Sequence, residues 1–332
     1  MLTPRDCADP LRRAMVLSAC ALPWLAQAAR SPEEAYPDRP VRFVVPYTAG
    51  SVGDLFLRQL AESLTRKLGQ AFIIDNRPGA SQAIGAIAVA KSAPDGYTLF
   101  LGSQSGMVLS SLARKKASFD PFKDFAPVSM LFTAPLFLCV NTAVKATRVD
   151  GLIAMAKANP GKLTFASIGP GTTSHLAGEL FKSMAGVDLL HVPYLGGPAA
   201  SNALAGGEVD MMFNGGNVLS YVAMGKVRVL GAGSAQRVAS KPELPTVAES
   251  GLPGFDVSPW FALFAPAGTP QPLVMRINKE IAIALKEPQL AERAAALALE
   301  IEPSTPKQLA SRLAEDFPVW EKVMRKAGIQ RE

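Results

Sequence analysis

The chain has 332 residues, of which 48% are hydrophobic and 19% are charged, so it is long enough for two domains and can bury a substantial core. Its formal net charge of +6 is spread along the chain, and the densest basic run, Arg114-Lys115-Lys116, is too short to indicate a nucleic-acid surface. We therefore expect no nucleic acid as a partner. A mild positive charge is compatible with an anionic small ligand.

The N-terminal residues have the pattern of an export signal. Arg12-Arg13 precede an apolar run that is too short to span a membrane, and Ala26-Gln27-Ala28 has the A-x-A pattern of a cleavage site. Residues 1–28 are therefore predicted to be a signal peptide cleaved near Ala28, which places the mature chain in the periplasm. The arginine pair leaves both Sec and twin-arginine export open. Lipoprotein processing at Cys20 is a less favoured alternative, and the soluble mature chain would keep only Cys139, which excludes an internal disulfide.

Strand and helix patterns alternate in the first part of the mature chain. In chain order the patterns predict a strand at 41–46, a helix at 54–68 ended by Gly69, a strand at 72–75, a helix at 81–91 and a strand at 97–101. This βαβαβ order predicts a parallel sheet with helices on both faces.

The apolar stretch 128–140 contains Pro135 and is too long for one regular strand, so we expect the chain to cross there to a second α/β lobe. Further segments are predicted as helices at 152–158, 174–185 and 199–205, and as strands at 163–166, 189–193, 209–213 and 227–231. A strand at 257–264 returns to the first lobe, followed by a helix capped by Thr269 that runs to about 286 and by helices at 289–299 and 307–327.

The fold class that follows is α/β with two lobes, each a mainly parallel sheet flanked by helices. The first lobe is discontinuous, at 36–134 plus 256–332, and the second occupies 135–255. Ligands in such sheets bind outside the carboxyl ends of the strands.

Four loops, each directly before a helix, consist of small residues, hydroxyls and glycines. They lie at 48–51, 103–105, 167–174 and 196–199. Such loops offer backbone N–H and hydroxyl donors and almost no charged side chains, which suits an anion held by oriented dipoles. A tight turn with a capped helix explains any one of them. Four such loops divided between two lobes favour an anion-binding cleft.

Catalytic patterns are weak. His175 and His191 have no cysteine or carboxylate at metal-ligand spacing, and Gly102–Gly106 does not match G-x-S-x-G. His175 is interpreted as a local hydrogen-bonding residue ahead of a general base. Asp54 stands three residues after Ser51, which predicts a helix cap ahead of a catalytic acid. We expect no catalytic residues, no metal, no cofactor and no enzymatic activity.

Several motifs occur together in a fixed order. They are Tyr36–Pro40, Pro46–Gly50, Asp75–Ala80, Ala93–Leu99, Asp124–Val128, Gly171–Phe181, His191–Tyr194, Pro245–Gly254 and Phe264–Pro270. With these motifs the chain resembles the Bug-type periplasmic solute-binding receptors of the tripartite tricarboxylate transporter family, from about Tyr36 to the end. The resemblance implies a type II periplasmic binding protein fold that closes on a small carboxylate and presents it to a membrane permease.

The resemblance also implies a set of ligand-binding residues. From the first lobe these are Tyr47, Thr48, Ala49, Gly50, Ser51, Ser103 and Ser105; from the second they are Ser167, Gly169, Gly171, Thr172, Ser174, Tyr194, Gly196, Gly197 and Asn214. The family commonly has Asp where this chain has Asn214, which disfavours an amino-acid ligand and favours a mono- or dicarboxylate. The expected partners are that ligand and the permease, with the receptor a monomer. A carboxylate-sensing subunit of a signalling system is the alternative.

Overall fold

The structure is a computed structural model that describes residues 35–114, 118–326 and 328–329. The predicted signal peptide lies outside these residues. Residues Pro37–Glu332 form one unit, and all that follows concerns that unit. Within the described residues, none of the helices combines the length and the apolar character that crossing a membrane requires.

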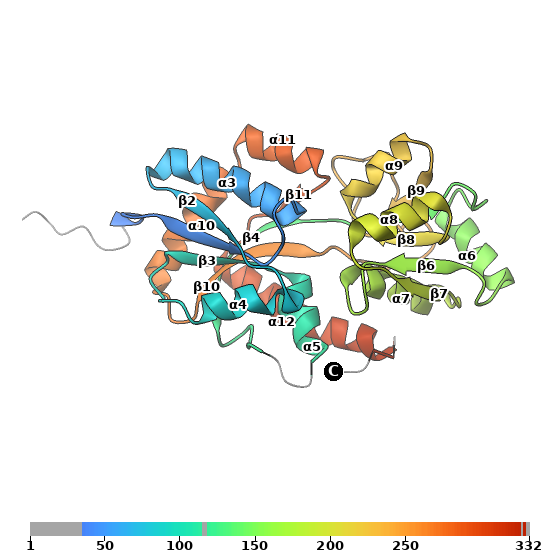
Figure 1. Cartoon of the computed structure of the whole chain (residues 1–332), viewed down its shortest axis with the longest axis horizontal. Coiled ribbons are helices and arrows are strands. Elements are labelled where there is room, and N and C mark those ends of the chain that lie inside the picture. Colours follow the sequence, from blue (N-terminus) through green and yellow to red (C-terminus); the bar gives the residue numbers. More distant parts are fainter. Residues whose placement is uncertain (1–34, 115–117, 327, 330–332) are drawn as a thin grey trace, which may run out of the picture. The chain divides into compact units, whose positions relative to one another are not determined.

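Six strands form the first sheet, in the order β11-β4-β10-β3-β1-β2 (Figure 1). Their bounds are β1 Val41–Val45, β2 Phe72–Asn76, β3 Thr98–Ser103, β4 Phe125–Thr133, β10 Trp260–Pro266 and β11 Glu300–Ile301. The pairs β1–β2 and β1–β3 are parallel, as the βαβαβ pattern predicted. The β-branched and aromatic residues of β1 suit its place between β3 and β2, because Val41, Phe43 and Val45 are fully buried.

Helices cover both faces of this sheet. Their bounds are α3 Val52–Leu68, α4 Ala83–Ala90, α10 Gln271–Ala284, α11 Pro288–Ala296 and α12 Pro306–Lys326, with short turns η1 Ala80–Gln82, η2 Ser105–Leu109 and α5 Ser110–Leu112. Helices α10 and α11 pack against α3, whereas α4 and α12 belong to the core of the opposite face (Figure 1). Gly69 ends α3 with φ 73°, as predicted, and its N–H donates to the Thr65 carbonyl.

Five strands form the second sheet, in the order β7-β6-β8-β5-β9. The elements of this region are β5 Phe137–Asn141, α6 Val149–Ala158, β6 Thr164–Ser167, α7 Thr173–Ala185, β7 Leu190–Pro193, α8 Gly197–Gly206, β8 Met211–Asn214, η3 Gly216–Val218, α9 Leu219–Ala223 and β9 Val227–Ala232. Helices α6 and α7 pack on one face, and α8 and α9 pack on the other. The two sheets flanked by helices confirm the predicted fold class.

Each sheet contains strands that run against their neighbours, and two of these strands mark the points where the chain changes sheets. β10 is antiparallel to β3 and β4, and β5 is antiparallel to β8 and β9. Each of these strands is the first that the chain forms after passing from one sheet to the other. The chain runs directly into each of these strands, without the helical crossover that connects parallel neighbours. The lobe boundaries given above remain a prediction.

Two sequence interpretations needed correction. The predicted cap at Thr269 is wrong, because α10 begins after Pro270 and the Thr269 hydroxyl donates to the Pro266 carbonyl instead. The strand predicted at 97–101 extends to Ser103, so Ser103 is the buried last residue of β3 and not part of a loop.

Candidate functional site

The strand register brings the carboxyl edges of the two sheets close together. Ser103 at the end of β3 pairs with Phe261, and Asn214 at the end of β8 pairs with Phe137. The chain passes from Thr133 to Phe137 in four residue steps, which span at most about 14 Å. The two connecting segments also bond to each other, with Ala134 N donating to the Pro259 carbonyl. The loops that follow β1, β2 and β3 therefore lie near those that follow β6, β7 and β8.

The loop between β1 and α3 is held by a buried carboxylate. The Ser51 hydroxyl accepts from the Asp54 N–H at 3.3 Å, and Asp54 Oδ2 accepts from the Gly50 N–H at 2.8 Å. Asp54 also pairs with Arg58 at 3.0 Å and accepts from the Asn76 amide at 2.9 Å. Burial acts to raise the pKa of Asp54, but these hydrogen bonds outweigh it and leave the pKa below its ordinary value. The predicted role of Asp54 as a helix cap is confirmed.

Tyr47, Ser103 and Gln82 form a closed ring of hydrogen bonds. The Tyr47 hydroxyl donates to Ser103 Oγ at 2.8 Å, Ser103 Oγ donates to Gln82 Oε1 at 3.1 Å, and Gln82 Nε2 donates back to the Tyr47 hydroxyl at 2.9 Å. Ser103 Oγ also accepts from the Gly106 N–H at 3.2 Å. Burial raises the pKa of Tyr47 to about 12, against the opposing effect of the Ser103 and Gln82 hydrogen bonds, so the phenol stays neutral. The ring joins the ends of β1 and β3 to the turn after β2.

That turn has an unusual backbone. Ala80, Ser81 and Gln82 have φ values of 47°, 52° and 76°, directly after Gly79 at 116°. Residues with a Cβ seldom adopt this left-handed region, and each costs roughly 1–2 kcal/mol there. Gln82 is only 8% exposed, and the ring fixes its side chain. Sequence analysis missed Gln82, because nothing in the local pattern distinguishes it from a polar surface residue.

The loop between β6 and α7 is held mainly by its own residues. The Ser174 hydroxyl accepts from the Ile168 N–H at 3.1 Å, the Thr172 hydroxyl donates to the Gly169 carbonyl at 2.6 Å, and Ser167 Oγ accepts from the Gly169 N–H at 3.1 Å. The first intrahelical bond of α7 is donated by Leu176 to Thr172. The amides of residues 173–175 therefore precede the helical bonding pattern and point out of the helix N-terminus.

Two stacked histidines support this loop from behind. The rings of His175 and His191 lie 3.9 Å apart at 15°, and His191 stacks in turn on Phe165. His175 Nδ1 accepts from the Gly171 N–H at 3.0 Å, and His191 Nε2 lies 2.7 Å from Ser167 Oγ. Burial lowers the pKa of each ring to about 4, and the Lys182 ammonium adds to the effect. Both rings are neutral near pH 7, and His175 is a local hydrogen-bonding residue, as predicted.

The last two predicted loops follow β7 and β8. Tyr194, Gly196 and Gly197 are partly exposed, and Gly196 has φ 95° with open space around its α-carbon. Asn214 is buried, donates to Ser201 Oγ at 2.8 Å, and accepts from the Gly215 N–H at 2.9 Å.

The structure thus divides the predicted ligand residues into two groups. Those at the surface are Thr48, Ala49, Gly50, Ser51, Ser105, Gly169, Gly171, Thr172, Tyr194, Gly196 and Gly197. Ser103, Ser167, Ser174 and Asn214 are buried and hydrogen-bonded within the protein, and Tyr47 is held in the ring. The surface residues are suited to contacting a ligand, and the buried residues are suited to fixing the shape of the loops.

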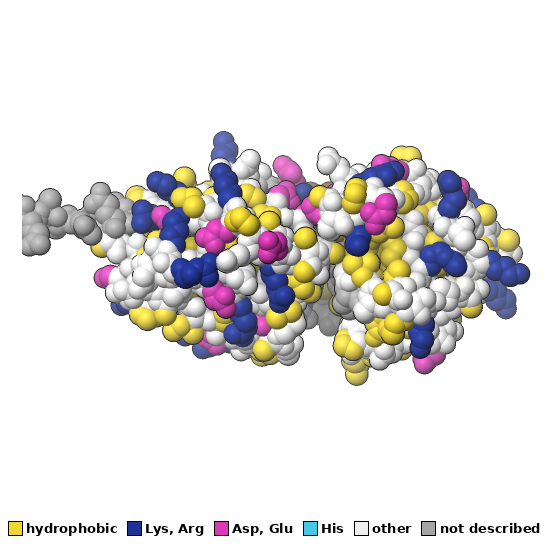
Figure 2. All heavy atoms as spheres, turned by 90° about the horizontal axis from the view of Figure 1, so that it is seen from above, with side chains coloured by type: hydrophobic (Ala, Val, Ile, Leu, Met, Phe, Trp, Pro, Cys, Tyr) yellow, Lys and Arg dark blue, Asp and Glu magenta, His cyan; other side chains and the backbone are white. Residues whose placement is uncertain are grey.

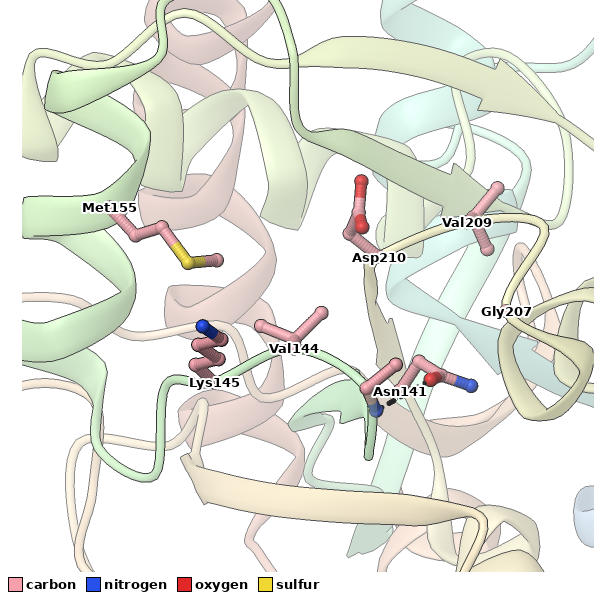
Figure 3. Close-up of a pocket in the computed structure, with 8 residues that line it drawn as sticks. Asn141, Val144, Lys145, Met155, Gly207, Val209 and Asp210 are labelled. Atoms are coloured by element: carbon pink, nitrogen blue, oxygen red, sulfur yellow. Dashed lines mark hydrogen bonds between the residues drawn. The ribbon is translucent and has the colours of Figure 1, made fainter.

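A cavity elsewhere in the second sheet is not this site. Its volume is about 290 Å³, and its lining includes Asn141, Lys145, Met155 and Asp210 (Figure 3). Asp210 precedes β8, so the cavity lies at the amino end of that strand, opposite the predicted loops. The Asp210 carboxylate is occupied by the N–H and hydroxyl of Thr164.

Neither the distribution of surface charge nor the placement of possible metal ligands indicates a second binding site among the described residues. Figure 2 shows Lys and Arg side chains scattered over one face, without a large patch of one sign. Across residues 35–114, 118–326 and 328–329, no three His, Cys, Asp or Glu side chains are placed to hold a metal ion. Cys139 is buried, and burial raises the pKa of its thiol.

Comparison with known proteins identifies the family. The family model described as "Tripartite tricarboxylate transporter family receptor" matches residues 56–329. This chain belongs to that family. Protein BugT of Bordetella pertussis is 37% identical over 303 residues, which cover 91% of this chain and 93% of BugT.

Two solved structures that are similar to this chain contain small carboxylates. Rpa4515 of R. palustris with adipate is 34% identical with a TM-score of 0.79, and the match covers 88% of this chain and 98% of Rpa4515. MatC (Rpa3494) from Rhodopseudomonas palustris with bound malate is 31% identical with a TM-score of 0.74, covering 87% and 99% of the two chains. Both the sequence and the fold therefore identify this chain as a solute-binding protein of the tripartite tricarboxylate transporter receptor family.

Proposed function

We propose that this chain is an extracytoplasmic receptor that captures a small dicarboxylate between its two lobes and delivers it to a tripartite tricarboxylate-type permease. The observation that carries the proposal is the pair of loop sets at the adjoining carboxyl edges of the sheets. Both sets offer hydroxyls and helix N-terminal amides and present no unpaired basic side chain among the predicted ligand residues. Adipate and malate in two solved relatives support a dicarboxylate ligand.

The donors fit a carboxylate better than an amino acid. The helix N-termini of α3, α7 and α8 orient amide dipoles toward an anion. An amino-acid ligand also needs an acceptor for its ammonium group. The buried carboxylate in the first turn of α3, Asp54, is already occupied by Arg58 and Asn76, and Asn214 is neutral. The buried Ser103 lies in a ring without a general base, which favours binding over hydrolysis.

A binding screen tests the proposal. The mature chain is titrated with adipate, malate, glutamate and aspartate by calorimetry, with thermal shifts in parallel, because a ligand that binds only the native state raises its stability. We expect at least one dicarboxylate to bind with a micromolar Kd, or about −8 kcal/mol. Tight binding of the amino acids glutamate or aspartate, with no binding of adipate or malate, would contradict the proposed ligand class.

Delivery to a permease needs a separate experiment. Uptake of the radiolabelled dicarboxylate is measured in a strain that lacks this receptor, with and without the wild-type gene. Restored uptake supports transport. Unchanged uptake with intact binding in vitro would instead favour a sensing role.

A further inference from the structure

We propose that Gln82 is a positioning residue that ties the turn after β2 to the two ligand loops that follow β1 and β3. The proposal rests on the proposed carboxylate function and adds a residue that the family motifs did not indicate. Gln82 is the one member of the hydrogen-bonded ring that bonds to both of the others through two different atoms of one amide.

The backbone at Gln82 argues that its side chain is needed there. Ala80, Ser81 and Gln82 all have φ values between 47° and 76°, and among the described residues the only other non-glycine residue with a positive φ is Ala298. Glycine adopts this conformation without strain. Three consecutive non-glycine residues keep this strained backbone conformation only where other contacts stabilise it. Backbone strain of this kind is concentrated at ligand-binding and switch sites.

Two kinds of contact hold the turn in place. The guanidinium of Arg114 donates to the Ala80 carbonyl at 3.0 Å, and the ring fixes Gln82 against Tyr47 and Ser103. The absence of a side chain at Gly106 also leaves space for Gln82, because a Cβ at position 106 would collide with Gln82 Oε1. Glycine at position 106 therefore leaves room for the Gln82 amide beside Ser103.

The ring determines how the first-sheet loops present their donors. Tyr47 leads into the exposed residues 48–50, and Ser103 precedes the partly exposed Ser105. Without the Gln82 amide, the Tyr47 hydroxyl loses a donor and Ser103 loses its acceptor. Only the Tyr47–Ser103 bond of the ring then remains, so the turn after β2 no longer braces the two loops and they become less ordered. Ordering them then becomes part of the cost of binding, which lowers the affinity.

Ser81 provides a matched control. It lies beside Gln82 in the same left-handed conformation, but its side chain is exposed and no partner for it is seen among the described residues. Gln82→Gly and Ser81→Gly relieve similar backbone strain, and only Gln82→Gly removes the ring. The pair therefore separates the effect of the side chain from the effect of the backbone.

The test compares the two variants with wild type. Calorimetry with adipate and malate should give a Kd about tenfold higher for Gln82→Gly, and a Kd within about twofold of wild type for Ser81→Gly. The Tm of Gln82→Gly should stay near that of wild type, because strain relief offsets the lost hydrogen bonds, whereas the Tm of Ser81→Gly should rise. A wild-type Kd for Gln82→Gly, or equal loss of affinity in both variants, would overturn the proposal.

Hydrogen exchange on the free protein distinguishes failure of this proposal from failure of the proposed function. Amides 47–51 and 103–106 should exchange faster in Gln82→Gly and at wild-type rates in Ser81→Gly. If wild type binds neither dicarboxylate, the proposed function fails while the exchange result still tests the link between the loops. Unchanged exchange in Gln82→Gly would overturn that link.

Discussion

The ligand loops of the two sheets are stabilised in opposite ways. On the first sheet, Tyr47, Gln82 and Ser103 come from three separate elements, and their ring spans up to 56 residues of sequence. On the second sheet, the loop 167–175 is held by bonds between residues no more than six apart, with His191 as the main distant partner. The first set depends on the folded sheet for its shape, whereas the second is largely a self-contained loop.

This difference bears on the proposed capture of a ligand between the two sheets. A self-contained loop keeps its shape when the sheets move relative to each other. A loop set fixed by a ring across three strand ends responds as a unit to a ligand or to a change at any one member. The predictions below test whether that contrast holds, starting with the largest expected effect.

The largest effect is expected from Asp54→Asn, which removes the carboxylate at the centre of the first-sheet loop. The change leaves Arg58 without its buried partner and weakens the bonds to Gly50 and Asn76. We expect the free energy of unfolding at pH 7 to fall by roughly 2–3 kcal/mol, below the full cost of breaking a buried pair because Arg58 is half exposed. Urea denaturation measures this. A loss under about 1 kcal/mol would show that the loop does not depend on Asp54.

The second-sheet loop should instead be sensitive to pH. Both histidine rings have a pKa near 4 in the folded protein and about 6.5 when unfolded. The unfolded state thus binds more protons below pH 6.5, so stability falls as the pH drops toward 4. Protonated His175 Nδ1 would also face the Gly171 N–H. Between pH 7 and pH 5 we expect the pair to lose on the order of 2 kcal/mol, after a discount for partial solvent access.

Urea denaturation at the two pH values checks the histidine prediction, with the double variant His175→Asn, His191→Gln as control. The charged groups that face the rings, Glu179 and Lys182, are unchanged in the control. The control should lose little stability between pH 7 and pH 5. An equal loss in wild type and control would assign the pH dependence to other groups.

The same contrast explains what could be read from the sequence. Local signals predicted correctly most of the helices and strands in their order, the Gly69 helix end and the Ser51–Asp54 cap. They did not predict α9 or β11, and they gave β4 and β5 only as the apolar stretch 128–140. The ring at Gln82 joins residues 21 and 35 positions apart and has no local signature. The positive φ values at 80–82 could not be predicted, because no glycine marks those three positions. The reversed direction of β5 and β10 is set by the passage between sheets, which residue periodicity does not report.

A paired comparison of Tyr47→Phe and Ser174→Ala tests the reach of each network. Tyr47→Phe leaves the buried Gln82 donor and the Ser103 acceptor with fewer partners, whereas Ser174→Ala removes one short-range acceptor. Each change should cost roughly 1–2 kcal/mol. Hydrogen exchange should increase at 80–82 and 103–106 in Tyr47→Phe, and only within 168–175 in Ser174→Ala. Changes confined to 47–51 in Tyr47→Phe would show that the first-sheet loops are independent.

The smallest effect on stability is expected from Ser51→Ala. The hydroxyl caps α3 through a 3.3 Å bond from the Asp54 N–H, while Asp54 still binds Gly50 and Arg58, so the loss should be about 1 kcal/mol or less. Ser51 is partly exposed, unlike Ser103, and can therefore also reach a ligand. Titration with adipate or malate separates the two roles. A several-fold higher Kd with a Tm close to wild type indicates a ligand contact, whereas an unchanged Kd would limit Ser51 to capping and leave binding on the first sheet to the exposed residues 48–50.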